Sequence, residues 1–281
     1  MTLPVEGHPT GRRLAVSTWS LHRTLGRPPI YGPDTAQPAW TRPADALPLL
    51  DLPAKLADFG ISTLEICHFS LPSTAPAYLA DLRAALDRAD VELWSLLIDG
   101  GDITHPEHGA RDLAWIEDWL PVAAALGARN VRVVAGMQPP TPVTVDRSVT
   151  ALRRIMDAAE QHGVHVMTEN WHALMDGPDV VTEILDRLQG DVGLCFDFGN
   201  WRGPDKYADL AAIAPYADSC HAMCAFDAAG TPDAADYARC LEIVDAAGFA
   251  GPYTLIYDGA DADEWRGLAV EREMVAPFLL E

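Results

Sequence analysis

The sequence has no long apolar run, few basic residues and few cysteines. A transmembrane helix needs about 18 or more consecutive apolar residues, and no segment of the 281-residue chain approaches that length. Residues 1–13 also lack the apolar core and cleavage site of a secretion signal. These absences predict a cytoplasmic protein that has no membrane partner.

Basic residues are outnumbered two to one by acidic residues. The chain has 20 Lys and Arg against 41 Asp and Glu, which gives a formal net charge of −21. Proteins bind the phosphates of nucleic acids through clustered Lys and Arg. The charge therefore predicts that the partner is not a nucleic acid.

The five cysteines form no recognisable framework. An odd number of cysteines scattered through apolar runs indicates buried free thiols rather than disulfides. Cys220, His221 and Cys224 resemble half of a zinc knuckle, but no second ligand pair follows at zinc-finger spacing. The first predicted strand is not followed by a glycine-rich turn, which argues against a dinucleotide-binding fold.

The sequence does contain a regular alternation of short apolar runs and amphipathic segments. Nearly continuous apolar strands with helices between them favour parallel strand pairing with the helices outside. The number of units and the chain length predict an α/β fold, a single (β/α)8 TIM barrel over residues 1–281 with a loose N-terminal segment at 1–13. Predicted strands cover 14–20, 62–69, 91–101, 130–136, 164–170, 192–201, 218–224 and 253–259, and predicted helices cover 44–59, 76–89, 109–126, 145–162, 178–188, 205–214, 232–247 and 263–280.

Ionisable and aromatic side chains collect where the predicted strands end. In (β/α)8 barrels, these carboxyl ends carry the chemistry. The apolar run 192–197 ends in Asp197, and Asn200 and Trp201 follow at once. The set at this predicted rim is Trp19, Glu65, His68, Asp99, Glu169, Trp171, His172, Asp197, Asn200, Trp201, His221 and Asp258.

Three successive predicted strands end in Glu169, Asp197 and His221. A buried carboxylate is costly unless it is paired or binds a metal, and one shared cation would satisfy all three side chains. Two carboxylates and an imidazole suit one divalent ion of Mn, Mg, Co or Zn. The alternative is a metal-free polar network in which Arg132 pairs with Glu169.

Five segments resemble the sugar phosphate isomerase/epimerase family of xylose-isomerase-like TIM barrels. They are LEICHF (64–69), TEN (168–170), CFDFGN (195–200), CHAMC (220–224) and AGFAGPYTLIYDG (247–259). The resemblance extends over nearly the whole chain. It implies that Glu169, Asp197 and His221 hold one divalent metal.

The family's fourth metal ligand does not carry over. Its eighth strand carries a Glu where this chain has Ile256, and its common His-x-Lys is here His221-Ala222-Met223. In the epimerases, two Glu residues exchange protons across the substrate, so the resemblance implies that this chain lacks the second acid/base. Asp258 lies two residues further on the same strand face and is the nearest substitute.

The prediction is a metal-dependent isomerase or lyase (dehydratase) that acts on a sugar, a cyclitol or a related polyhydroxy carbonyl compound through an enediolate. Glu169 or His172 is the predicted base, and the metal stabilises the enediolate. One alternative is a degenerate barrel that binds a sugar-like ligand without metal or catalysis. Another is a DNA-repair endonuclease, which the net charge disfavours. Homo-oligomerisation stays open. The predicted substrate contacts are Trp19, Glu65, His68, Asn200, Trp201 and Asp258.

Overall fold

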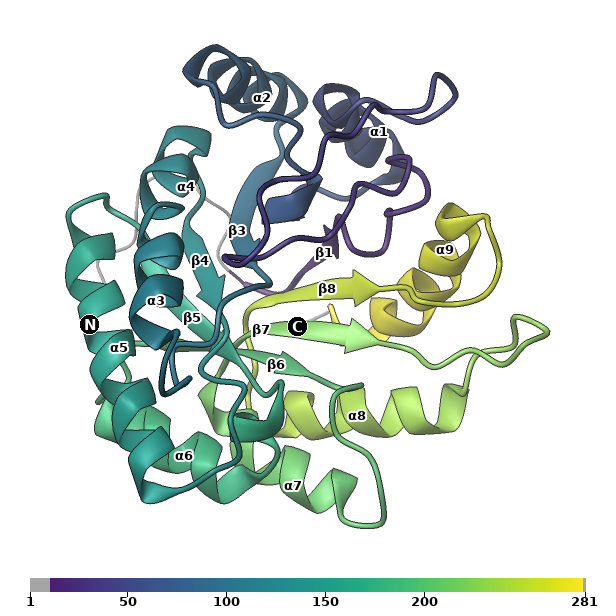
Figure 1. The fold of residues 1–281 in the computed structure, drawn as a ribbon. Helices are drawn as coiled ribbons and strands as arrows, with labels where there is room; N and C mark the ends of the chain where they lie inside the picture. The colour runs from purple at the N-terminus through teal and green to yellow at the C-terminus, as the bar shows by residue number, and fades with distance from the viewer. Residues whose placement is uncertain (1–10, 280–281) are drawn as a thin grey trace.

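The computed structural model describes residues 11–279, which form a closed parallel barrel surrounded by helices (Figure 1). The strands follow one another around the barrel in sequence order, and β1 pairs with β8 to close it. This topology confirms the predicted (β/α)8 fold. The strands are β1 (Arg13–Ser17), β2 (Thr63–Cys67), β3 (Glu92–Ile98), β4 (Asn130–Val133), β5 (His165–Glu169), β6 (Gly193–Asp197), β7 (Ala217–Met223) and β8 (Pro252–Ile256).

Most strands end earlier than the sequence pattern predicts. The predicted strand 14–20 stops at Ser17, because the chain turns there and the amide of Ser20 donates to the carbonyl of Ser17. The predicted strand 253–259 stops at Ile256. Rim side chains such as Trp19 and Asp258 therefore lie in loops, beyond the last rung of the barrel.

The helices lie outside the barrel, where they cover its strands (Figure 1). The predicted helix 109–126 is two helices, because Pro121 has no amide hydrogen and begins a new helix after a turn at Asp118. No helix of the described chain is both long and apolar enough to span a membrane. The α-helices are α1 (Leu52–Phe59), α2 (Pro76–Ala89), α3 (Gly109–Glu117), α4 (Leu120–Leu126), α5 (Pro142–Glu160), α6 (Pro178–Arg187), α7 (Lys206–Ile213), α8 (Ala234–Ala246) and α9 (Glu264–Val275), and 3-10 turns cover Leu49–Asp51, His68–Ser70, Ala173–Met175, Ala214–Tyr216 and Ala276–Phe278.

Local sequence signals set several helix ends. Gly60 and Gly127 follow α1 and α4 with φ of 82° and 76°, the left-handed conformation that glycine adopts without penalty. The Thr141 hydroxyl caps α5 by accepting a hydrogen bond from the Thr144 amide, and the Thr141 amide donates one to the Thr144 hydroxyl. Residues 27–43, all described, contain neither helix nor strand. The extent of the single domain over 1–281 stays a prediction, and residues 1–10 of the predicted loose segment lie outside the described part.

The main core lies between the barrel and the helix layer. Strand residues such as Leu64 and Leu194 form one cluster with helix residues such as Leu152. A second, small cluster contains Trp94, Met167 and Cys195. Met167 and Cys195 each precede a rim acid by two residues, so they lie inside the barrel, one layer below Glu169 and Asp197.

One carboxyl group is isolated in the outer core. Glu271 of α9 is fully buried, and its Oε1 accepts only a long hydrogen bond of 3.4 Å from the Cys224 amide. Its Oε2 accepts none from any described residue. Burial therefore raises the pKa of Glu271 well above its usual value.

Candidate active site at the carboxyl end of the barrel

A pocket of about 140 Å³ opens at the carboxyl ends of the strands. One part of its wall is charged or polar, and another part is apolar or aromatic. This division suits a polyhydroxy compound, which presents both hydroxyl groups and C–H faces. The lining residues are Ser17, Trp19, Cys67, Leu97, Asp99, Arg132, Glu169, Trp171, Asp197, Asn200, His221, Met223, Ile256 and Asp258.

The structure brings Glu169, Asp197 and His221 together in this pocket. Asp197 and His221 are direct neighbours in the β6–β7 ladder, and Glu169 ends the adjacent strand β5. His221 Nδ1 lies 3.5 Å from Asp197 Oδ2 and 3.9 Å from Glu169 Oε2. Each of these two separations from His221 is about that of two donor atoms on one divalent ion when each bond is about 2.0–2.2 Å long. The three side chains whose donor atoms all lie within 4.8 Å of one another are Glu169, Cys195 and His221, without Asp197.

Glu65 orients His221 from below the pocket. Its Oε2 lies 2.8 Å from His221 Nε2, and Glu65 is buried and does not line the pocket. This bond turns the other ring nitrogen, Nδ1, toward the two carboxylates, as in carboxylate–histidine–metal arrangements. Burial lowers the pKa of His221, but the neighbouring Cys195, Glu65 and Glu169 outweigh it and raise that pKa well above its usual value.

The two carboxylate oxygens of Asp197 have different roles, because one holds a turn of the main chain and the other faces the pocket. Oδ1 accepts hydrogen bonds from the amides of Gly199 and Asn200, at 2.6 and 2.9 Å, and so fixes the turn after β6. Oδ2 faces His221. The main chain of Asp197 is held by Asn170, whose side-chain amide bonds both its N–H and its C=O. Asn170 was not predicted, although it follows Glu169 directly in the TEN segment.

Glu169 is held from two sides. Asn200 Nδ2 donates to Oε1 at 2.7 Å, and Arg132 Nε lies 3.1 Å from Oε2. The Arg132 N–H does not point at that oxygen, so Oε2 accepts no hydrogen bond from any described residue. Burial raises the pKa of Glu169, while the positive charges of Arg132 and His221 oppose the rise.

Negative charge is in excess around the pocket. The side chains of Glu65, Asp99, Glu169 and Asp197 are all at most 7 % exposed. The cationic groups beside them are Arg132, which pairs with both Asp99 and Glu169, and His221. Even with a protonated imidazole, four carboxylates and two cations leave two uncompensated negative charges. This excess favours a divalent cation, whose binding to His221 Nδ1 requires that nitrogen to lose its proton.

The remaining predicted site residues fall into two groups. Trp19, Asn200 and Asp258 line the pocket, and Trp19 is 37 % exposed. His68 and Trp201 are buried away from it. His68 Nε2 lies 2.9 Å from the carbonyl of Tyr31, and its Nδ1 accepts a hydrogen bond from the Asp99 amide. The Trp201 indole donates a hydrogen bond to the carbonyl of Met175.

His172 lies just outside the pocket wall. It has a φ of 63°, uncommon for a residue other than glycine, and its ring lies against Trp171 at a centroid distance of 3.9 Å. Nε2 is buried and accepts no hydrogen bond from any described residue. Burial lowers the pKa of His172, and Arg132 lowers it further, so the imidazole is neutral at pH 7.

The last residues of β7 and β8 form an apolar part of the pocket wall. Ile256 pairs with Met223 across these strands, and both line the pocket. Ile256 thus occupies the position at which the family resemblance places a Glu. Among the described residues, the β8-side acid on the pocket wall is Asp258, in the loop after the strand.

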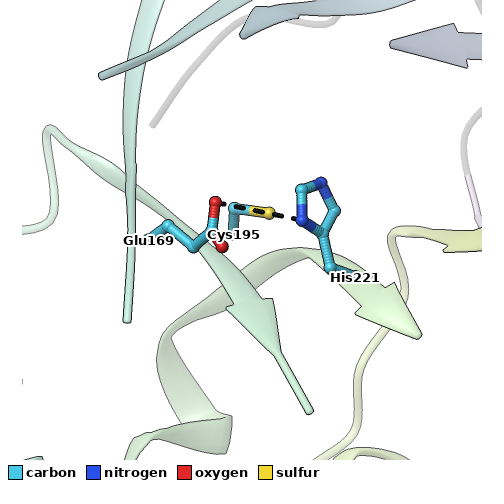
Figure 2. A group of neighbouring side chains, drawn as sticks. All are labelled: Glu169, Cys195 and His221. Atoms are coloured by element: carbon cyan, nitrogen blue, oxygen red, sulfur yellow. Dashed lines mark ion pairs between the residues drawn. The ribbon is translucent and has the colours of Figure 1, made fainter. Parts of the chain in front are cut away.

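Cys195, predicted from the sequence only as a buried free thiol, lies at the site. Its Sγ, a Glu169 carboxylate oxygen and a His221 ring nitrogen all lie within 4.8 Å of one another. Figure 2 shows the carboxylate and the imidazole pointing toward each other with the sulfur atom beside them. Burial raises the pKa of Cys195 to about 11. The signal was available, because Cys195 precedes Asp197 by two residues and so shares its strand face.

The chain belongs to the xylose isomerase-like TIM barrel family, whose model matches residues 53–273. This result confirms the resemblance to sugar phosphate isomerases and epimerases. A search of curated protein sequences gives no significant match.

Solved structures with the same barrel include proteins named for sugar chemistry. A xylose isomerase domain protein from Planctomyces limnophilus is 17 % identical with a TM-score of 0.68, over 96 % of this chain and 98 % of its own. The D-psicose 3-epimerase of Clostridium cellulolyticum H10, solved with D-tagatose, is 14 % identical with a TM-score of 0.69, over 95 % and 99 %. A xylose isomerase-like protein from Mycobacterium smegmatis, solved with magnesium, is 17 % identical with a TM-score of 0.65, over 95 % and 98 %. At these identities the likeness establishes the fold alone.

Proposed function

We propose that this protein is a divalent-metal-dependent isomerase or lyase that acts on a sugar, a cyclitol or a related polyhydroxy carbonyl compound. The observation that carries the proposal is the convergence of Glu169 Oε2, Asp197 Oδ2 and His221 Nδ1 in one pocket. Membership of a family of xylose isomerase-like barrels and structural neighbours that bind sugars support it.

The residues present fit a divalent ion of Mn, Mg, Co or Zn. Glu169 Oε2 is buried without a hydrogen bond from the described residues, His221 Nδ1 is aimed by Glu65, and the surroundings carry excess negative charge. Glu169, Asp197 and His221 would hold the ion. When bound, it would supply a Lewis acid that polarises a substrate carbonyl and a neighbouring hydroxyl.

Glu169 is the proposed base that removes a proton from the carbon next to the carbonyl. It lines the pocket, and burial moves the pKa of its carboxyl upward, toward the range in which a base works at neutral pH. His172 is the second candidate, because its imidazole is neutral and can accept a proton. It ranks below Glu169 because it lies behind the wall residue Trp171. On the β8 side, the strand itself offers Ile256 instead of an acid, and Asp258 lies beyond it in the loop. One-sided proton transfer therefore favours isomerisation or dehydration over two-sided epimerisation.

The other predicted contacts divide into direct and supporting roles. Trp19 and Asn200 would touch the substrate, the first with an apolar face and the second with an amide. Asp258 would bind a substrate hydroxyl. Glu65 would support His221, and His68 would support the rim loop at Asp99. Trp201 would support the rim loops by packing beneath them.

Metal analysis combined with deuterium exchange tests the proposal. Purified protein should contain one equivalent of a divalent ion, and Glu169→Ala and Asp197→Ala should lose it, whereas the surface variant Glu117→Ala should retain it. In D2O, D-allulose, D-tagatose or a cyclitol ketone should gain deuterium. Exchange should vanish in Glu169→Gln at matched metal content and persist in His172→Gln. Exchange that survives in both variants would leave the mechanism without its base.

A second candidate function is sugar binding without metal or catalysis. The ion pair between Arg132 and Glu169 favours it, because the guanidinium partly neutralises the carboxylate that a metal would otherwise need. In that case the wild-type protein would bind a sugar with no divalent ion present. Glu169→Gln would then leave sugar affinity nearly unchanged.

A small-molecule partner in place of nucleic acid is consistent with the net charge of −21, and a cytoplasmic location stays a prediction. Sedimentation of the purified protein would measure whether it forms a homo-oligomer.

A further inference from the structure

The barrel interior below the pocket contains a sulfur donor that the proposed metal site does not use. Cys195 is 1 % exposed and lies beside Glu169 in the β5–β6 ladder. Because strand side chains alternate, Cys195 projects to the same interior side as Asp197, one layer lower. Its Sγ lies within 4.8 Å of ligand atoms of both Glu169 and His221.

Two of these three groups are already prepared to bind a cation. Glu169 Oε2 is buried and accepts no hydrogen bond from the described residues. His221 has its Nε2 bonded to Glu65, which leaves Nδ1 on the side of Glu169. Donor atoms on one tetrahedral zinc ion are about 3.3–3.6 Å apart, so the three groups lie within about 1.5 Å of that spacing.

The pocket wall lacks a donor at the end of β8. The β8 position that faces the pocket is Ile256, which cannot ligate. Glu169, Cys195 and His221 offer three donors that lie within 4.8 Å of one another, and an ion that expands to five-coordinate with Asp197 keeps one position open for substrate.

We propose that Cys195 supplies a thiolate ligand in place of the missing β8 carboxylate and thereby makes the site selective for a borderline-soft ion, Zn²⁺ or Co²⁺, over Mg²⁺. Binding breaks the S–H bond, forms a sulfur–metal bond and releases one proton to the solvent, with no oxidation or reduction. Thiolate ligands select zinc-like ions, whereas carboxylate sites without sulfur suit Mg²⁺ and Mn²⁺. This inference rests on the proposed metal site.

Cobalt substitution tests the thiolate directly, without an activity assay. The full-length protein is stripped with a chelator and loaded with one equivalent of Co²⁺. Wild type should show an intense near-ultraviolet thiolate-to-cobalt band. Cys195→Ser and Cys195→Ala should lose that band, and Cys195→Ser should lose at least about tenfold in its preference for Zn²⁺ over Mg²⁺. Cys220→Ala is the matched control, because Cys220 is also fully buried but belongs to the outer core, and it should keep the band.

X-ray absorption of the zinc-loaded wild type gives a second measurement that needs no variant. It should show one sulfur at about 2.3 Å from zinc. Stoichiometric cobalt or zinc without a sulfur ligand would overturn the role of Cys195 and leave the proposed function intact. Failure of the wild type to bind Zn²⁺, Co²⁺, Mn²⁺ or Mg²⁺ would overturn both.

Discussion

Replacing Arg132 by methionine should lower the stability of the metal-free barrel and at the same time tighten metal binding. The Arg132 side chain is 4 % exposed and pairs with Asp99 and Glu169, whose side chains are 7 % and 6 % exposed. Removing one partner of a buried ion pair leaves an uncompensated charge and costs about 3–5 kcal/mol. Loss of the guanidinium also frees Glu169 to interact with a cation alone.

Urea unfolding measures the first effect. At pH 7 and without divalent ions, the free energy of unfolding of Arg132→Met should fall by about 3–5 kcal/mol. Arg154 pairs with Glu117 on the surface with 61 % exposure, so Arg154→Met should leave the free energy of unfolding nearly unchanged. Adding Asp99→Asn to Arg132→Met should recover part of the loss, because one of the two stranded carboxylates is then neutral.

Calorimetric titration with Zn²⁺ or Mn²⁺ measures the second effect. A metal at one hundred times its Kd stabilises the folded state by about 2.7 kcal/mol. At equal metal concentration, the variant should gain more stability than the wild type because its Kd is lower. A loss below about 1 kcal/mol in the metal-free state would show that the pair is not truly desolvated. Unchanged metal affinity would refute the idea that Arg132 and the cation compete for Glu169.

Two further variants test the apolar pocket wall and the isolated carboxyl group. Ile256→Glu should restore a ligand on β8 and raise metal affinity at least about tenfold, which is about 1.4 kcal/mol; equilibrium dialysis against Ile256→Gln checks this. For Glu271, the folded pKa is raised, so its favourable contribution is complete below the unfolded pKa of about 4.3 and is lost as pH rises toward the folded value. Glu271→Gln should therefore flatten the stability–pH curve across this window and be more stable than wild type at pH 8. Urea unfolding at pH 5 and pH 8 measures both effects, and parallel curves for the two proteins would contradict a raised pKa.

The barrel could be predicted from the sequence because each strand is buried on both faces. Such strands appear as short, nearly continuous apolar runs, and a glycine or a proline often marks where the next element begins. The limits of strands were less predictable. An apolar run continues past the last ladder hydrogen bond whenever the loop also packs against the core, as at Tyr257, which is 3 % exposed but lies beyond β8.

Strand ends also predicted which side chains gather at the site, but not what each one contacts. Glu169, Asp197 and His221 converge because parallel strands bring their carboxyl ends to one rim. Glu65 belongs to the same rim in sequence terms, yet it lies beneath His221. The difference depends on barrel stagger and on a register shift between Leu64 and Glu65. Neither is visible in residue types or spacing.

The replacement at Ile256 and the cysteine at position 195 have a common physical logic. A buried acid next to Glu169 and Asp197 would add to an already excessive negative charge, whereas a thiol is neutral until a cation displaces its proton. The metal-free barrel is therefore more stable with Ile256 on β8 and a thiol below the rim than it would be with a further buried carboxylate. On this argument, Ile256→Glu should destabilise the metal-free protein even as it strengthens metal binding, and the two effects should be separable by unfolding the same variant with and without chelator.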